Sequence, residues 1–137
     1  MSAADQLTPT HAAHAMRFIN RDEALDLLMA GGMPNFLHLR AESAIVQIYG
    51  DTMAPEYESG DTVLINAAWC AIGQPGVYVL RTDDGFIAQR CNPVPYSEPR
   101  MVVLCRDART DPMETVPASS LDVVGFVVCG VDTERHT

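Results

Sequence analysis

Few side chains of this 137-residue sequence are suited to chemistry. All nine basic residues are arginines and there is no lysine, which excludes lysine-dependent chemistry such as Schiff-base formation or a lysine general base. The cysteines form no Cys-x-x-Cys pair, and we interpret them mostly as small buried apolar residues. They are Cys70, Cys91, Cys105 and Cys129.

Histidines add little to this set. His11 and His14 share a helical spacing, but two histidines without further ligands do not make a metal site, so we expect no metal and no cofactor. His38 lies in an alternating run that is typical of a strand, which favours a structural or surface histidine. A catalytic site rebuilt as a Cys–His or Thr–His pair on His38 remains the alternative.

Charge and hydropathy exclude further classes. The net charge of −9, from 18 acids against nine arginines, argues against direct nucleic-acid binding by this chain alone. The sequence has no apolar run long enough to span a membrane, and its first residues lack the pattern of a secretory signal. We therefore expect a cytoplasmic protein with reduced thiols and no membrane partner.

The most informative stretch runs from residue 46 to residue 65. A β-rich run ends in Gly-Asp-Thr-Met-Ala-Pro at Gly50–Pro55, and Gly-Asp-Thr-Val-Leu-Ile follows at Gly60–Ile65. This pattern resembles the catalytic domain of the LexA-type and phage repressors, the S24 peptidase family. Residues Gly85–Arg90 resemble the family's strand with the lysine base followed by arginine, and Leu121–Val128 resemble its C-terminal strand.

The resemblance places Thr52 where the family has its serine nucleophile and Gln89 where it has its lysine base, at the family's spacing. A threonine hydroxyl can act as a nucleophile, although its extra methyl group crowds the attack. A glutamine amide has no basic lone pair, and the neighbouring Arg90 guanidinium stays protonated. The dyad is degenerate, and we expect no catalytic residues.

The resemblance implies a mainly β, LexA-like antiparallel fold with one short N-terminal helix. We divide the chain into residues 1–40, an N-terminal arm and short helix without a helix-turn-helix, and residues 41–137, an S24 peptidase-like β domain. The arm extends to about residue 19. A helix of about ten residues begins after Asn20, with acids in its first turn, and ends at Gly31 and Gly32.

Short β-rich runs separated by Gly, Pro and Asp turns predict a mostly antiparallel, barrel-like fold. A loop containing Pro112 and Pro117 separates the last two runs. The expected strands are residues 43–49, 62–66, 76–81, 85–91, 101–105 and 121–131.

These features predict a non-catalytic domain for protein interaction and dimerisation, in transcription or in phage- or SOS-type regulation. The resemblance implies a homodimer through the C-terminal strand, with another regulatory protein as partner. Docking would use the exposed 76–91 hairpin, by strand addition, and a cleft. The cleft residues are Gly50, Asp51, Thr52, Met53, Gln89 and Arg90.

Two alternatives remain. One is a residual Thr52-dependent peptidase that cuts itself or another chain. The Ala30–Gly31 bond has the small-residue–Gly form of the family's cleavage bond, but the simpler interpretation is a helix stop, and we do not expect cleavage there. The other is an unrelated small β domain in which the Gly-Asp-Thr-Met turn arose by chance.

Overall fold

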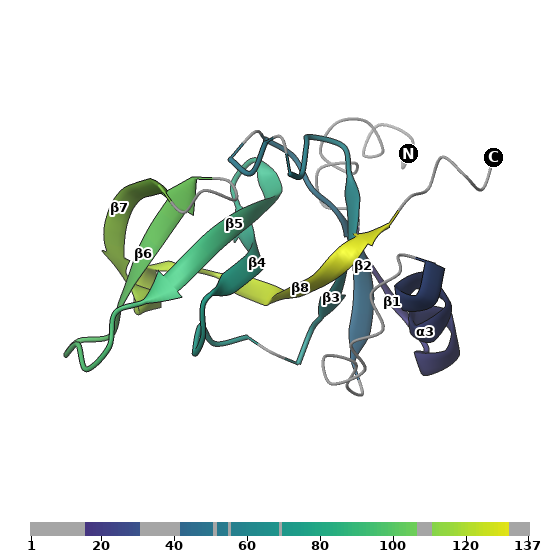
Figure 1. Cartoon of the computed structure of the whole chain (residues 1–137), viewed down its shortest axis with the longest axis horizontal. Helices are drawn as coiled ribbons and strands as arrows, with labels where there is room; N and C mark the ends of the chain where they lie inside the picture. The colour runs from purple at the N-terminus through teal and green to yellow at the C-terminus, as the bar shows by residue number, and fades with distance from the viewer. Residues whose placement is uncertain are drawn as a thin grey trace, which may run out of the picture.

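The computed structural model describes residues 16–30, 42–50, 52–54, 56–68, 70–106 and 111–131. Within them, one α-helix accompanies an eight-stranded sheet in which all neighbouring strands are antiparallel (Figure 1). The expected mainly β class with one short helix is confirmed for these residues. The elements are β1 Met16–Ile19, α3 Arg21–Ala30, β2 Ser43–Gln47, β3 Thr62–Asn66, β4 Gly76–Thr82, β5 Gly85–Pro93, β6 Met101–Arg106, β7 Asp111–Pro117, the 3-10 turn η2 Ala118–Ser120 and β8 Val123–Val131.

Strand β8 joins the two halves of the sheet, whose order is β1-β2-β3-β8-β4-β5-β6-β7. Its C-terminal part pairs with β3 and its N-terminal part with β4, so it crosses the middle of the molecule as the long yellow strand of Figure 1. The crossing is tight, because a Cβ on Gly125 would lie 2.7 Å from the main-chain oxygen of Asn66. Glycine at this position lets β8 and β3 approach closely.

The sheet curls around two apolar cores. In the first half, the main-chain nitrogen of Tyr49 donates to the oxygen of Phe86 at 2.8 Å, which brings the chain after β2 beside β5. The first core is formed by residues from both halves, namely Ala44, Val46, Ile48, Met53, Val63, Ile65, Ala67, Val77, Val79, Phe86, Ala88, Val124 and Val127. The second half encloses Ile72, Tyr78, Leu80, Cys91, Val102, Leu104 and Phe126.

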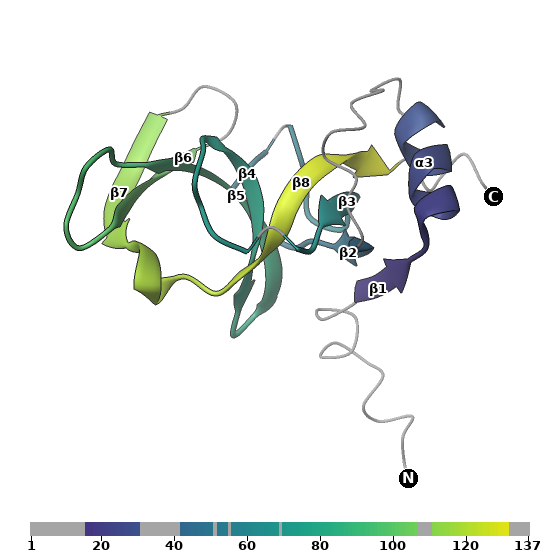
Figure 2. The same ribbon diagram turned by 90° about the horizontal axis from the view of Figure 1, so that it is seen from below.

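Helix α3 has the bounds that the sequence predicts. The Asn20 side-chain oxygen accepts a hydrogen bond from the Glu23 main-chain nitrogen at 2.8 Å, which is the N-cap interaction. Ala24 and Leu28 of the helix are fully buried in a third cluster that includes Leu64. Figure 2 shows α3 at the end of the molecule opposite β7.

Two expectations about strands are wrong. The weakly patterned arm was expected to reach residue 19, but Met16–Ile19 form β1, which pairs with β2 and buries Ile19 in the helix cluster. The expected loop with Pro112 and Pro117 contains β7. Proline is tolerated there because β7 is the last strand in the sheet order and pairs with β6 alone among the described strands.

The 76–91 hairpin is only partly exposed at its outer edges. Strand β4 pairs with β8 over residues 78–80, and β5 pairs with β6 over residues 90–93. The outer edge of β5 over residues 85–89 pairs with no described strand. Consecutive residues are buried in both strands because cores lie on both faces, which sequence alone does not reveal. No helix among the described residues is long and apolar enough to cross a membrane.

Candidate functional site

The turn that contains Thr52 is held by main-chain geometry. Gly50 and Gly60 have φ values of 88° and 97°, in the left-handed region that favours glycine, which confirms them as turn glycines. The Gly60 nitrogen donates to the Ile48 oxygen at 2.7 Å, and the Ile48 nitrogen donates to the Asp61 oxygen at 2.9 Å. These two hydrogen bonds therefore hold the start and the end of the turn side by side.

Additional side-chain contacts fasten this turn. The Gly50 nitrogen donates to the Ser59 hydroxyl at 3.2 Å, and the Glu58 nitrogen donates to an Asp61 carboxylate oxygen at 2.9 Å. Met53 is 1% exposed and packs into the first core. Because Met53 anchors the turn, the half-buried Thr52 next to it is held in place relative to the sheet.

The turn lies beside β5, the strand that contains Gln89. Besides the bond from Tyr49 to Phe86, a Cβ on Gly50 would lie 3.8 Å from the Ile87 Cγ2 atom. The sequence motif and the later strand are thus brought together. Among the cleft residues, Gly50, Thr52, Met53, Gln89 and Arg90 belong to these two segments, and Asp51 lies outside the described residues.

The Gln89 side chain is buried, with 3% of its surface exposed. Its Nε2 donates to the Cys105 oxygen at 2.7 Å and to the Arg90 oxygen at 3.2 Å. Two carbonyl acceptors fix which end of the amide is the nitrogen. Within the described part of the chain, neither contact is to Thr52, so the amide serves as a donor to the framework of β5 and β6.

The carboxylates and arginine near the turn are also engaged. The Arg90 guanidinium lies 2.9 Å from a carboxylate oxygen of Glu56, with 20% and 37% of the two side chains exposed. This ion pair connects the segment after Thr52 to β5. Asp61 accepts the Glu58 main-chain hydrogen bond described above. The side chains of Arg90, Glu56 and Asp61 therefore stabilise the fold through contacts with other parts of the chain.

Cysteine offers no activated nucleophile in the buried part of the fold. Cys91, Cys105 and Cys129 are buried, as expected, and all four cysteines are free thiols. Burial, and then the nearby Cys105, raise the pKa of Cys91 to about 12, and burial also raises the pKa of Cys129. Both thiols stay protonated at neutral pH and are poor nucleophiles.

Cys70 corrects the expectation of burial, because it is exposed on the segment that connects β3 to β4. Its thiol donates to the Ala67 oxygen at 3.1 Å. The segment places Ala67 and Ile72 in the two cores, while Cys70 between them lies at the surface. A cysteine among apolar neighbours in sequence is thus not buried when its segment is a surface connection.

The other sequence candidates fall largely outside the described residues. This holds for His11, His14, His38 and Gly31, while Ala30 is the exposed last residue of α3. Among the residues that the structure describes, no group of three histidine, cysteine or acidic side chains could hold a metal ion. The structural or surface role of His38 therefore stays a prediction, with the rebuilt catalytic site as its alternative.

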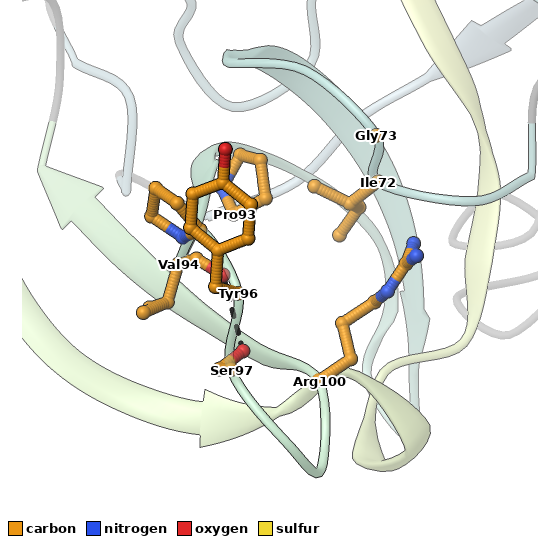
Figure 3. A pocket seen from close by; sticks show the side chains of 8 residues that line it. Ile72, Gly73, Pro93, Val94, Tyr96, Ser97 and Arg100 are labelled. Atoms are coloured by element: carbon orange, nitrogen blue, oxygen red, sulfur yellow. Dashed lines mark hydrogen bonds between the residues drawn. The ribbon is translucent and has the colours of Figure 1, made fainter.

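A pocket that the sequence analysis missed lies at the far end of β5. Its volume is about 390 Å³, and Figure 3 shows the Tyr96 ring on one side with Ile72 and Arg100 on the other. Its lining residues are Ile72, Gly73, Pro93, Val94, Pro95, Tyr96, Ser97 and Arg100. A tyrosine that follows two prolines in the run Pro-Val-Pro-Tyr is the signal that could have indicated it, because such a loop is stiff.

A scan against protein-family models and a search of curated proteins found no match to this chain.

Proposed function

We propose that this chain is a non-catalytic domain of the LexA and S24 peptidase type. Its role is protein interaction and homodimerisation, in transcription or in phage- or SOS-type regulation in the cytoplasm. The observation that carries the proposal is the side chain at position 89. Gln89 uses its amide nitrogen to donate to two main-chain oxygens, and an amide cannot take a proton from the Thr52 hydroxyl.

The arrangement around Gln89 supports a peptidase scaffold. The turn with Gly50 and Thr52 runs beside β5, so the nucleophile position and the base position lie on adjacent segments. In this proposal the residue at the base position is a hydrogen-bond donor to the main chain of Arg90 and Cys105 and does not act as a base. A domain of this type without its base would serve in binding and not in catalysis.

Dimerisation through the C-terminal strand has a specific support. Residues 127–131 of β8 pair with β3 along one edge, and their other edge pairs with no described strand. The same applies to the outer edges of β1 and β7, which end the sheet order of the described strands. A second chain could add a strand at these edges, as at the unpaired part of the 76–91 hairpin.

The catalytic half of the proposal is tested by restoring the dyad. The double variant Thr52→Ser with Gln89→Lys is treated with a fluorophosphonate probe, which labels activated serines, beside the unchanged protein. The matched control combines Thr52→Ala with Gln89→Lys. We expect label on the first variant only. Label on the unchanged protein, or none on a folded double variant, would contradict a peptidase scaffold that has lost its base.

The dimer is tested separately by sedimentation velocity over a range of concentrations. The proposal expects a species of twice the 14.9 kDa chain mass. Substitution Val131→Pro, at the half-buried last residue of β8, removes a main-chain donor from this strand and should weaken the dimer. A chain that stays monomeric at every concentration would contradict the homodimer.

A further inference from the structure

The pocket at the end of β5 is held open by its own loop. The Ser97 hydroxyl donates to the Val94 oxygen at 3.1 Å and accepts from the Met101 nitrogen at 2.9 Å, and the Val94 nitrogen donates to the Met101 oxygen at 2.9 Å. The dashed line in Figure 3 marks the first of these bonds. Ile72, 4% exposed, belongs to the second core and supplies a fixed apolar wall. The cavity is therefore preformed, which lowers the entropic cost of binding.

Tyr96 is unusual in both its backbone and its ring. Its φ of 58° is the one left-handed value among the described residues other than glycine. Its side chain is fully exposed, so the ring gains no burial within the described chain that would offset this conformation. Such outliers are typical of binding sites. An exposed tyrosine ring also presents a large rigid surface that a partner can cover at small entropic cost.

Arg100 supplies a positive charge at the same pocket. Within the described residues it forms no ion pair, unlike Arg17, Arg81 and Arg90. A guanidinium beside apolar walls binds a carboxylate through strong, charge-assisted hydrogen bonds.

We propose that this pocket binds a peptide segment of a partner protein that carries a carboxylate next to an apolar or aromatic side chain. The side chain lies between Ile72 and Tyr96, and the carboxylate pairs with Arg100. A single carboxylate matches the single positive charge of the pocket. A nucleic-acid strand fits less well, because Glu98 is exposed on the same loop and the chain has a net charge of −9.

The inference does not depend on the proposed function, because the pocket shares no residue with the Thr52 turn. It is tested by NMR titration of the full isotope-labelled chain with N-acetylphenylalanine. The matched probe is N-acetylphenylalaninamide, which has the same ring without the carboxylate. We expect the acid to shift the amide signals of Gly73, Val94 and Ser97 with a Kd on the order of 1 mM, as suits so small a molecule.

The uncharged probe should bind at least about tenfold more weakly. The same loss is expected for the acid with Arg100→Gln. Arg21→Gln, the matched control, removes an exposed arginine at the start of α3, at the opposite end of the molecule in Figure 1, and should leave binding unchanged. Tyr96→Gly removes the ring and should weaken binding several-fold while keeping the spectrum of a folded chain.

Three results would overturn the proposal. The first is equal binding of the two probes, and the second is binding that Arg100→Gln leaves unchanged. The third is a tighter response of the same signals to adenosine monophosphate, which would assign the pocket to nucleotides. Because the readout is confined to the pocket signals, failure here leaves the labelling result at Thr52 unaffected, and the reverse also holds.

Discussion

The two regions that flank β5 use their polar side chains in opposite ways. Beside the Thr52 turn, Gln89 is buried and donates to two main-chain oxygens, and Arg90 is paired with Glu56. At the other end of the strand, Tyr96 and Arg100 line an open pocket. Within the described chain the Tyr96 ring is not buried and Arg100 forms no ion pair. The polar side chains beside the Thr52 turn stabilise the fold, while those of the pocket face its open volume. Residues of the first kind should matter for stability and those of the second for binding.

The sharpest contrast in stability is expected for Gln89→Ala. This variant leaves the Cys105 oxygen without its side-chain donor and creates a cavity between β5 and β6. We expect the free energy of unfolding to fall by about 2–4 kcal/mol. Urea denaturation measures this loss. Arg100→Gln, the matched change in the second region, should stay within about 0.5 kcal/mol of the unchanged protein. Equal losses would erase the contrast between the two regions.

A pH effect tests burial along the same strand. The pKa of Cys91 is raised from 9.0 to about 12 in the folded chain, so folding favours the protonated thiol. The stability that the protonated Cys91 thiol contributes is fully present below pH 9 and is lost as the pH rises toward 12. By about pH 10.5 this effect should have lowered the free energy of unfolding by about 2 kcal/mol. Urea denaturation at several pH values should show a shallower alkaline decline for Cys91→Ala. Parallel declines would contradict this burial.

The ion pair beside the turn should have a smaller effect. Glu56→Gln removes the carboxylate that pairs with Arg90, and both side chains are partly exposed. We expect a loss of about 0.5–1 kcal/mol that shrinks in high salt. Chemical denaturation at low and high ionic strength checks both the loss and its screening. A loss that does not change with salt would mean that packing of the Glu56 side chain dominates.

The smallest effect is expected in the pocket loop. Tyr96→Gly relieves the left-handed backbone of Tyr96 and removes a ring that is not buried in the chain. The strain relieved should exceed the entropic cost of glycine in the unfolded state, so we expect the free energy of unfolding to rise by about 0.5 kcal/mol. Thermal unfolding should show a Tm that is unchanged or slightly raised. A clear fall would show that the ring stabilises the fold.

The sequence predicts regular elements well where the local signal is strong. Helix α3 and β3 have the predicted bounds, because an N-cap and Gly/Asp turns mark their ends. Strand β1 was missed because four residues carry too short a pattern, and β7 because its prolines suggested a loop. Both strands form through pairing with neighbours distant in the sequence, which local patterns do not contain.

The candidate site also contains features that the sequence predicts and features that it does not. The turn around Thr52 could be predicted, since its glycines are part of the motif. The hydrogen bond from Gln89 to the Cys105 oxygen could not, because it depends on the pairing of β5 with β6. The pocket was missed because Ile72 comes from a different segment than Tyr96 and Arg100, and only the folded sheet brings them together.

We propose that the Thr52 site carries out no peptide cleavage. The most direct measurement is the intact mass of the purified chain after a day at high pH, beside the Thr52→Ala variant treated identically. The account predicts that both proteins keep their full mass, because Gln89 cannot activate the Thr52 hydroxyl. A cut in the unchanged protein that is absent from Thr52→Ala would contradict it.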